Sequence, residues 1–167
     1  MDARETGSLL LDLVNSRIVW PDGERDELGD DRDARAWLRA HGGSGSAEEI
    51  AGAREVRPVL VGLLRGTEEP SALDPWVAQM RRQASLDEGH LVWRLDVPDR
   101  VVVGALAIEE WSALQTPTGS RIRACADPEC QHFLIDRSAA NRRRWHSMET
   151  CGNRTKARRH YARTRQT

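Results

Sequence analysis

The three cysteines of the chain, Cys125, Cys130 and Cys151, all lie in its last third. With His146 they give the spacing C-x4-C-x15-H-x4-C, which is two close pairs of donors joined by a longer connection. Zn²⁺ in structural sites prefers four tetrahedral nitrogen and sulfur ligands, and three cysteines with one histidine are a standard set. Asp127 and Pro128 favour a turn between the first two cysteines. The pattern predicts a structural zinc site whose four protein ligands leave no open position for catalysis.

Other interpretations of these residues stay open at this point. The cysteines could be buried packing residues. A disulfide framework is disfavoured, because their number is odd and the chain has no recognisable export signal. His132 and His160 compete with His146 for the fourth position. His132 follows Cys130 so closely that it would crowd the turn, and His160 would lie ~13 Å along a helix that begins at Cys151. His146 is therefore the favoured ligand.

Charge divides the chain into two unequal parts. Residues 1–119 hold 13 basic and 22 acidic residues, a net charge of −9, whereas residues 120–167 hold 12 and 4, a net charge of +8. A basic end beside an acidic body favours binding to a polyanion. Arginines would mostly contact phosphates, while Arg154, Arg158 or Asn153 could reach base edges. The predicted nucleic-acid contacts are Arg142, Arg143, Arg144, Asn153, Arg154, Lys156, Arg158, Arg159, Arg163 and Arg165.

The stretch CADPECQHFLIDRSAANRRRWHSMETCGNRTKARRHY resembles the CGNR zinc finger, named for the tetrad that stands here at residues 151–154. The segment LLLDLVNS, with a Trp-Leu pair further on, resembles the stress-related, ABATE-like domain that usually precedes that finger. Members of this family are regarded as bacterial transcription regulators, so the resemblance implies DNA binding. The family commonly has cysteine where His146 stands, and histidine is an ordinary replacement in zinc sites.

Apolar periodicity predicts a mainly α-helical protein, with helices over 8–19, 30–43, 46–66, 71–84 and 101–115 and a short β element over 91–95. Pro58 is expected to kink or divide the third helix. Residues 133–145 predict two short strands around a polar turn, so that the finger would be treble-clef-like and end in a basic helix. The predicted domains are a helical sensing or dimerisation domain over 1–119 and the nucleic-acid-binding finger over 120–167.

Five of the six tryptophans lie in the acidic body, where filling the core is the favoured interpretation and an aromatic ligand cavity is the alternative. Polar side chains within the first apolar segment could also face such a cavity, although they more commonly cap, pair or face water. The candidate contacts of a small-molecule effector are Asp12, Asn15, Arg17, Trp37 and Trp93.

The function predicted from these patterns is transcription regulation through DNA, by a protein that senses a ligand, forms a homodimer, or both. An RNA-binding module is the first alternative, because charge does not separate RNA from DNA. A protein-interaction module with an autoinhibitory basic tail is the second. The sequence contains no Gly-rich phosphate loop, no HExxH motif and no nucleophile elbow, so we do not expect an enzyme. No long apolar run indicates a membrane span, and the acidic N-terminus lacks a signal-like basic region, so a cytoplasmic location is expected.

Overall fold

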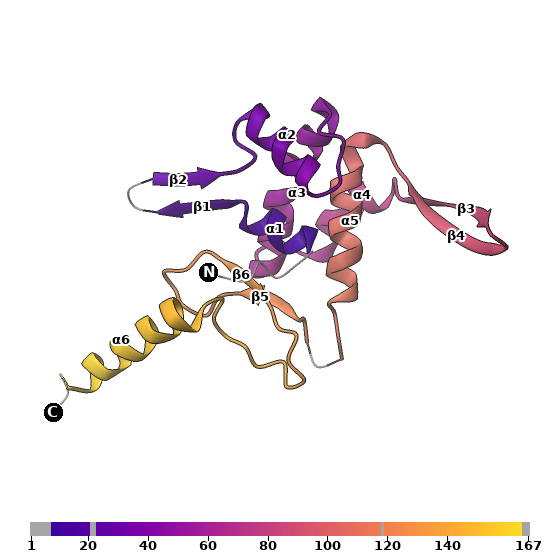
Figure 1. The fold of residues 1–167 in the computed structure, drawn as a ribbon. Helices are drawn as coiled ribbons and strands as arrows, with labels where there is room; N and C mark the ends of the chain where they lie inside the picture. The colour runs from indigo at the N-terminus through magenta and orange to yellow at the C-terminus, as the bar shows by residue number, and fades with distance from the viewer. Residues whose placement is uncertain (1–7, 21–22, 118, 165–167) are drawn as a thin grey trace.

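A computed structural model describes residues 8–20, 23–117 and 119–164 of the 167-residue chain (Figure 1). Its elements in chain order are α1 (Leu9–Asn15), β1 (Arg17–Trp20), β2 (Gly23–Asp26), α2 (Asp31–Ala40), α3 (Ala47–Arg65), the 3₁₀ turn η1 (Pro70–Leu73), α4 (Asp74–Val77), β3 (Arg81–Asp87), β4 (His90–Asp96), α5 (Asp99–Ala113), β5 (Ile122–Ala124), β6 (Phe133–Ile135), the π-helical turn η2 (Met148–Gly152) and α6 (Asn153–Thr164). Within the described ranges, no helix combines the length and apolarity that crossing a bilayer requires.

The core of the molecule lies where α1, α3 and α5 pack together. Each helix places an apolar face inward, as its periodicity predicts, and the tryptophan of α2 closes one side of the cluster. Buried members of this cluster include Leu10, Leu13, Trp37, Leu38, Ile50, Val56, Leu60, Val103 and Ala107. Burial of this apolar surface is the main force that holds the helices together.

The longest helix, α3, runs unbroken through Pro58, so the expected division of the helix at this residue is wrong. Its ends follow the sequence: the Ser46 hydroxyl accepts the N–H of Glu49, and Gly66 ends the helix with a left-handed φ of 72°. Proline inside a helix costs about 3 kcal/mol. The fully buried side chains of Val56 and Leu60, which flank Pro58, offset that cost by packing in the core.

Helices α3 and α5 lie close together at Gly52. A Cβ atom at this position would collide with the backbone carbonyl of Arg100, at the start of α5. The absence of a side chain at Gly52 therefore permits the packing of the two longest helices.

We predict that Gly52→Ala destabilises the protein by about 1–3 kcal/mol, because the new methyl group overpacks against backbone that cannot rotate away. Urea unfolding followed by circular dichroism measures the change. Gly23→Ala is the matched control, since a Cβ there meets nothing within 4 Å. Equal stability of the two variants would contradict this close packing.

The described residues form three antiparallel hairpins, where the sequence predicts a short β element over 91–95 and two short strands within 133–145. The helix expected over 71–84 is wrong beyond Val77, because Arg81–Asp87 pairs as β3 with β4. A two-residue turn joins these strands: Glu88 and Gly89 have φ values of 46° and 81°, the pair of positive angles that tight hairpins require. Hairpins β1–β2 and β3–β4 both extend from the helical body (Figure 1).

The third hairpin, β5–β6, joins the C-terminal third to the helical body. Ile122, Phe133 and Ile135 are buried in the same cluster as α1 and α3. The Asn15 side chain, at the end of α1, accepts the N–H of Phe133 at 2.8 Å and donates to its carbonyl at 3.2 Å. The hydrophobic core therefore continues across the boundary predicted at residues 119 and 120, which itself stays a prediction.

We expect Asn15→Ala to lower the free energy of unfolding by about 1–3 kcal/mol, because the half-buried backbone groups of Phe133 lose their partner. Asn15→Asp is the informative companion, since it keeps an acceptor for the N–H but loses the donor for the carbonyl. Chemical denaturation should rank the wild type above both variants. Wild-type stability in Asn15→Ala would show that the clamp contributes nothing.

Candidate metal centre and the basic helix

The backbone brings the four predicted ligands together from three places. Cys125 follows β5 directly, and its N–H donates to the carbonyl of His132, so the hairpin ladder continues to the ligand. The Cys130 N–H closes the intervening turn on the carbonyl of Asp127 at 2.9 Å. The next strand, β6, carries the chain away before the loop over 136–147 returns it to His146.

The fourth ligand lies in the π-helical turn η2. The Ser147 hydroxyl accepts the N–H of Thr150, and the Ser147 carbonyl accepts the N–H groups of Cys151 and Gly152. These bonds satisfy backbone donors at the start of the turn and fix the direction of the Cys151 side chain. A Cβ at Gly152 would lie 2.7 Å from the sulfur of Met148, so the exposed Met148 side chain would have to move.

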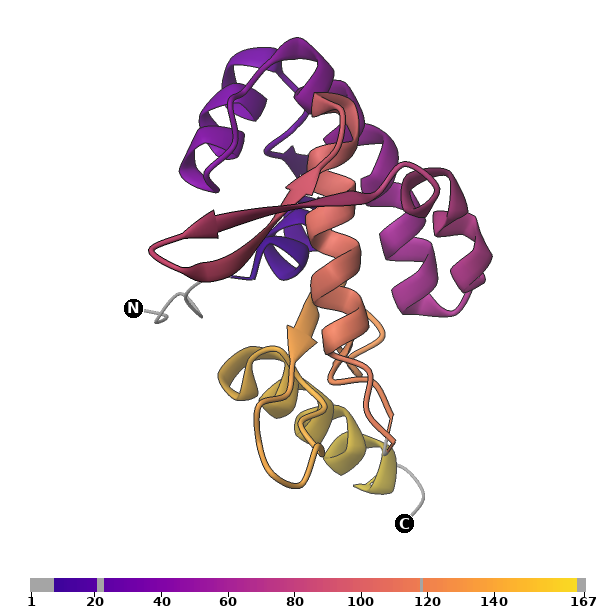
Figure 2. The ribbon, with the colours of Figure 1, turned by 90° about the vertical axis from the view of Figure 1, so that its right-hand side faces the viewer.

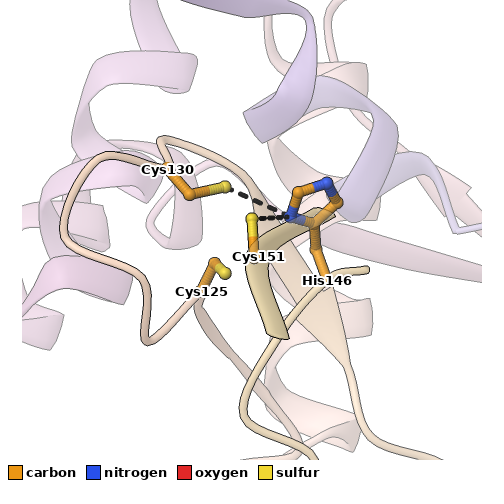
Figure 3. Close-up of side chains that lie close together, drawn as sticks. All are labelled: Cys125, Cys130, His146 and Cys151. Carbon is orange, nitrogen blue, oxygen red and sulfur yellow. Dashed lines mark hydrogen bonds between the residues drawn. The ribbon is translucent and has the colours of Figure 1, made fainter. Parts of the chain in front are cut away.

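The ligand atoms of Cys125, Cys130, His146 and Cys151 all lie within 4.8 Å of one another (Figure 3). The His146 Nδ1 atom is 3.1 Å from the Cys130 sulfur and 3.4 Å from the Cys151 sulfur. Zinc–sulfur bonds of about 2.3 Å and zinc–nitrogen bonds of about 2.0 Å in a tetrahedron require donors at separations of this order. Three cysteines and one histidine thus converge as a closed zinc site does.

The chemistry of the thiols also fits a cation. Without a cation, burial raises the pKa of the Cys130 thiol to about 12, and burial likewise raises the pKa of Cys151. Neutral thiols packed this closely would attract one another only weakly. A bound Zn²⁺ instead stabilises the thiolates and offsets the free-energy cost of burying their charge. The fit is that of one structural zinc ion.

His132, the rival for the fourth position, lies beside the site but outside the converging set. Its ring stacks on His146 with centroids 4.3 Å apart, and its Nδ1 atom is 3.6 Å from the Cys130 sulfur. The stacked ring restricts the rotation of His146 and so helps to aim its Nδ1 atom at the sulfurs. His132 is therefore a support for the ligand.

A buried carboxylate, Asp127, connects the turn between the first two cysteines to α6. It is 0% exposed and accepts Arg154 Nε at 2.7 Å and Arg158 Nη1 at 3.1 Å. Burial opposes its ionisation, but hydrogen bonds from Arg154, the Glu129 N–H and Arg158 outweigh burial and lower the pKa of Asp127 to about 2. Glu129 adds a second carboxylate, 2.5 Å from Arg158 Nη2.

These contacts explain most of the Cys-Gly-Asn-Arg tetrad. Cys151 is a ligand, Gly152 leaves room for Met148, and Arg154 holds Asp127 while its Nη2 atom lies 3.7 Å from the ligand sulfur of Cys151. Asn153 is exposed at the first position of α6. Arg154 thus contacts both the ligand Cys151 and the turn between Cys125 and Cys130.

Residues 121–164 match the family model of the CGNR zinc finger. A search of curated proteins found no match for the chain. The match and the geometry together identify the C-terminal segment as a zinc finger with a Cys₃His centre. The resemblance of the N-terminal segment to the stress-related domain stays a prediction.

The finger does not have the treble-clef-like order expected from the sequence. Its hairpin is β5–β6, which encloses the first two cysteines, and residues 142–147 contain no strand. The buried carboxylate of Asp136 explains the difference, since it accepts the N–H of Ser138 at 2.9 Å and that of Arg143 at 2.6 Å. A hydrogen bond from the Ser138 hydroxyl, followed by these backbone bonds, lowers the pKa of Asp136 to about 2. The bonds together fold residues 136–143 into a loop.

The predicted nucleic-acid contacts fall into distinct groups. Arg154 and Arg158 are paired with Asp127, and Arg143 donates to the carbonyls of Trp145 and His146. Arg142, Arg144, Asn153 and Lys156 are exposed, with the Arg144 guanidinium 5.4 Å from the centre of the Trp145 ring. The side chains of Arg159 and Arg163 lie outside the description, as does Arg165 altogether.

The structure places the five candidate effector contacts in different surroundings. Asn15 clamps β6, Arg17 pairs with Glu24 at 3.0 Å, and Trp93 is exposed on β4. Asp12 and Trp37 do lie close together, because both contact His41, with the Asp12 carboxylate 3.1 Å from its Nε2 atom and the Trp37 ring stacked on it.

Two hollows lie in the described surface, and the five candidates line neither of them. One of about 200 Å³ lies beside His41, between the loop at 42–44 and α5, and none of the five candidates lines it. The other, of about 520 Å³, lies between the end of α5 and the finger hairpin. It is lined by Ser8, Glu110, Ala113, Leu114, Arg121, Ile135, Arg137, Ser138 and Ala139.

Asp127 and Asp136 are the supporting residues that the sequence did not reveal as such. The sequence indicates Asp127 only as a turn former, because nothing local to it shows that its carboxylate is buried against two arginines of α6. Asp136 ends an apolar strand and precedes Ser138, which is typical of a side chain that caps a turn.

We predict that Cys130→Ser abolishes stoichiometric zinc, whereas His132→Ala retains it, because only the first change removes a donor from the converging set. Elemental analysis of protein purified without chelators measures the metal. The Cys130→Ser variant should also unfold at a lower temperature, since structural zinc contributes directly to folding. Loss of zinc in His132→Ala with its retention in Cys130→Ser would reverse the assignment.

Neighbouring cations on α6 should behave differently in thermal unfolding. Arg154→Gln should lower the unfolding temperature, because it leaves the buried Asp127 carboxylate with a weaker set of donors. Lys156→Gln should leave that temperature unchanged, because its exposed ammonium has no ion pair among the described residues. Differential scanning calorimetry of the zinc-loaded proteins makes the comparison, and identical curves would refute the clamp.

Proposed function

We propose that the protein is a bacterial transcription regulator that binds DNA through the zinc finger. The supporting observation is the zinc-centred frame that holds the first turn of α6 while exposed cations surround it. Arg142 and Arg144 lie on the preceding loop, and Lys156 lies on the helix itself. A rigid cationic surface of this kind suits a polyanion, because its charges need little ordering on binding.

The structure divides the arginines and lysine of the finger by their surroundings. Arg154 and Arg158 are positioning residues, because their guanidinium groups hold the buried Asp127. Of the predicted contacts, Arg142, Arg144 and Lys156 are the described cations that remain for phosphates, with Asn153 as the candidate for a base edge. This assignment moves the centre of the proposed interface from the Asp127 side of α6 to the exposed loop and the opposite helix face.

Duplex DNA is favoured over single-stranded RNA by the state of the aromatic side chains. Phe133 is buried in the core, and the half-buried Trp145 lies next to the Arg144 guanidinium. Tyr161 is the exposed aromatic residue of α6, at 68%. Sequence-specific recognition of single strands uses several stacking surfaces, whereas phosphate contact requires none.

The arrangement of α6 also supports an accessible binding surface. The helix extends away from the acidic body (Figure 1), and the ion pairs of Arg154 and Arg158 are made within the finger. An autoinhibitory tail would require the opposite arrangement, with α6 against residues 1–119. We propose that the helical body acts instead as the sensing or dimerising part of the regulator.

Fluorescence anisotropy with zinc-loaded, full-length protein tests this function. We expect mixed-sequence duplex DNA to bind more tightly than single-stranded RNA, with affinity that falls steeply as salt rises. Arg142→Gln and Lys156→Gln should each weaken binding and lower the slope of log affinity against log salt by about 0.9. Arg32→Gln, at an exposed cation of α2, is the matched control and should have no effect.

A salt-independent affinity would contradict the proposal, as would equal loss in the Arg32→Gln control. Tighter binding of single-stranded RNA than of duplex DNA would transfer the function to the RNA alternative. Selection of bound sequences from a random duplex pool would then show whether the finger reads bases or only phosphates.

A further inference from the structure

The β3–β4 hairpin is an exposed arm with an apolar face. In the register of the hairpin, Leu86 lies opposite Leu91, Ala84 opposite Trp93, and Arg82 opposite Leu95, and opposite residues share one face. Five of these six side chains are apolar. Leu86 is 77% exposed, Leu91 58% and Trp93 56%, and apolar side chains exposed together on one face indicate an interaction surface, which scattered ones do not.

Few contacts hold this arm in place. The hairpin leaves the body beside α5 (Figures 1 and 2), and the ion pair of Arg82 with Glu109, at 2.7 Å, links its base to that helix. An isolated two-stranded hairpin is marginally stable in water, and three or more strands with an apolar face are needed for independent stability. The outer edge of each strand also presents unpaired backbone groups.

The sequence of β4 is complementary to itself when two copies run antiparallel about Trp93. In this register Leu91 of one copy lies opposite Leu95 of the other, so two apolar pairs flank a central pair of tryptophans. On the opposite face, His90 lies opposite the carboxylate of Asp96, once at each end. The pairs at Trp93, Leu91–Leu95 and His90–Asp96 are thus matched in polarity or charge, whereas Val92 lies opposite Arg94.

The backbone alternation agrees with this register. In an antiparallel ladder, alternate residues direct their N–H and C=O groups to one side, so every second residue of β4 faces the free edge. Pairing about Trp93 places residues 91, 93 and 95 of one copy against 95, 93 and 91 of the other. Edge-facing groups therefore meet edge-facing groups along the whole strand.

We propose that this arm is a homodimerisation element, in which the β4 edges of two copies pair antiparallel about Trp93 into a four-stranded sheet. The pairing is isologous, as two-fold symmetric dimers require. Pairing through one seven-residue edge buries less surface than a standard interface, which covers about 800 Å² per partner. We therefore expect the dimer to dissociate on dilution. This inference does not rest on the nucleic-acid function.

Analytical ultracentrifugation of the full-length, zinc-loaded protein over a dilution series tests the dimer. We expect a monomer–dimer equilibrium that Trp93→Glu weakens at least about 30-fold, since it places two carboxylates at the symmetry axis. Ser85→Glu, on the polar face of β3, is the matched control and should dimerise like the wild type. Unchanged zinc content and circular dichroism would show that both variants fold.

Disulfide trapping tests the register. A mixture of Leu91→Cys and Leu95→Cys chains should cross-link into a heterodimer under mild oxidation far more readily than either chain alone. A wild-type protein that stays monomeric at the highest concentration would overturn the proposal. So would a dimer that Trp93→Glu leaves intact, or cross-linking that does not depend on mixing the two variants.

Discussion

Three sulfur atoms and an imidazole nitrogen lie within 4.8 Å of one another in the C-terminal third, and the rest of that third is arranged around them. Thiolates at this spacing repel one another unless a cation lies between them, so zinc determines whether the arrangement is stable. It joins the turn after β5, the loop before η2 and the start of α6 into one unit. Around it, the buried Asp127 turns Arg154 and Arg158 inward, which fixes the rotation of α6 about its axis. The zinc ligand Cys151 and the two arginine–Asp127 ion pairs, all near the N-terminus of the basic helix, therefore set its orientation.

The zinc finger is also continuous with the helical body. Phe133 is held by Asn15 through its backbone and lies under the Arg65 guanidinium, 5.6 Å from the ring centre. Ile122 and Ile135 bury their side chains in the cluster that α1 and α3 form. A change of packing in the body would reach the finger through these contacts. This continuity gives a physical basis for coupling an event in residues 8–117 to the orientation of α6.

The zinc ligands could be predicted because their signal is local: rare residue types at a spacing that one ion demands. Helices α2, α3 and α5 could also be predicted from the sequence, because the signals of a helix, such as the cap Ser46 and a regular apolar face, lie within one segment. Asn15 could not be recognised as a clamp, because its partner lies 118 residues away. The polar strand β3 exists only through its pairing with β4. The arginines of α6 were all assigned outward, since no sequence pattern shows that Asp127 is buried beneath two of them.

X-ray absorption spectroscopy at the zinc edge of the purified full-length protein tests the central claim most directly. The account predicts one zinc ion per chain with three sulfur neighbours at about 2.3 Å and one nitrogen neighbour at about 2.0 Å. A first shell dominated by oxygen, a shell of four sulfurs, or less than one ion per chain would contradict the Cys₃His centre. The orientation of α6 inferred from it would then have no basis.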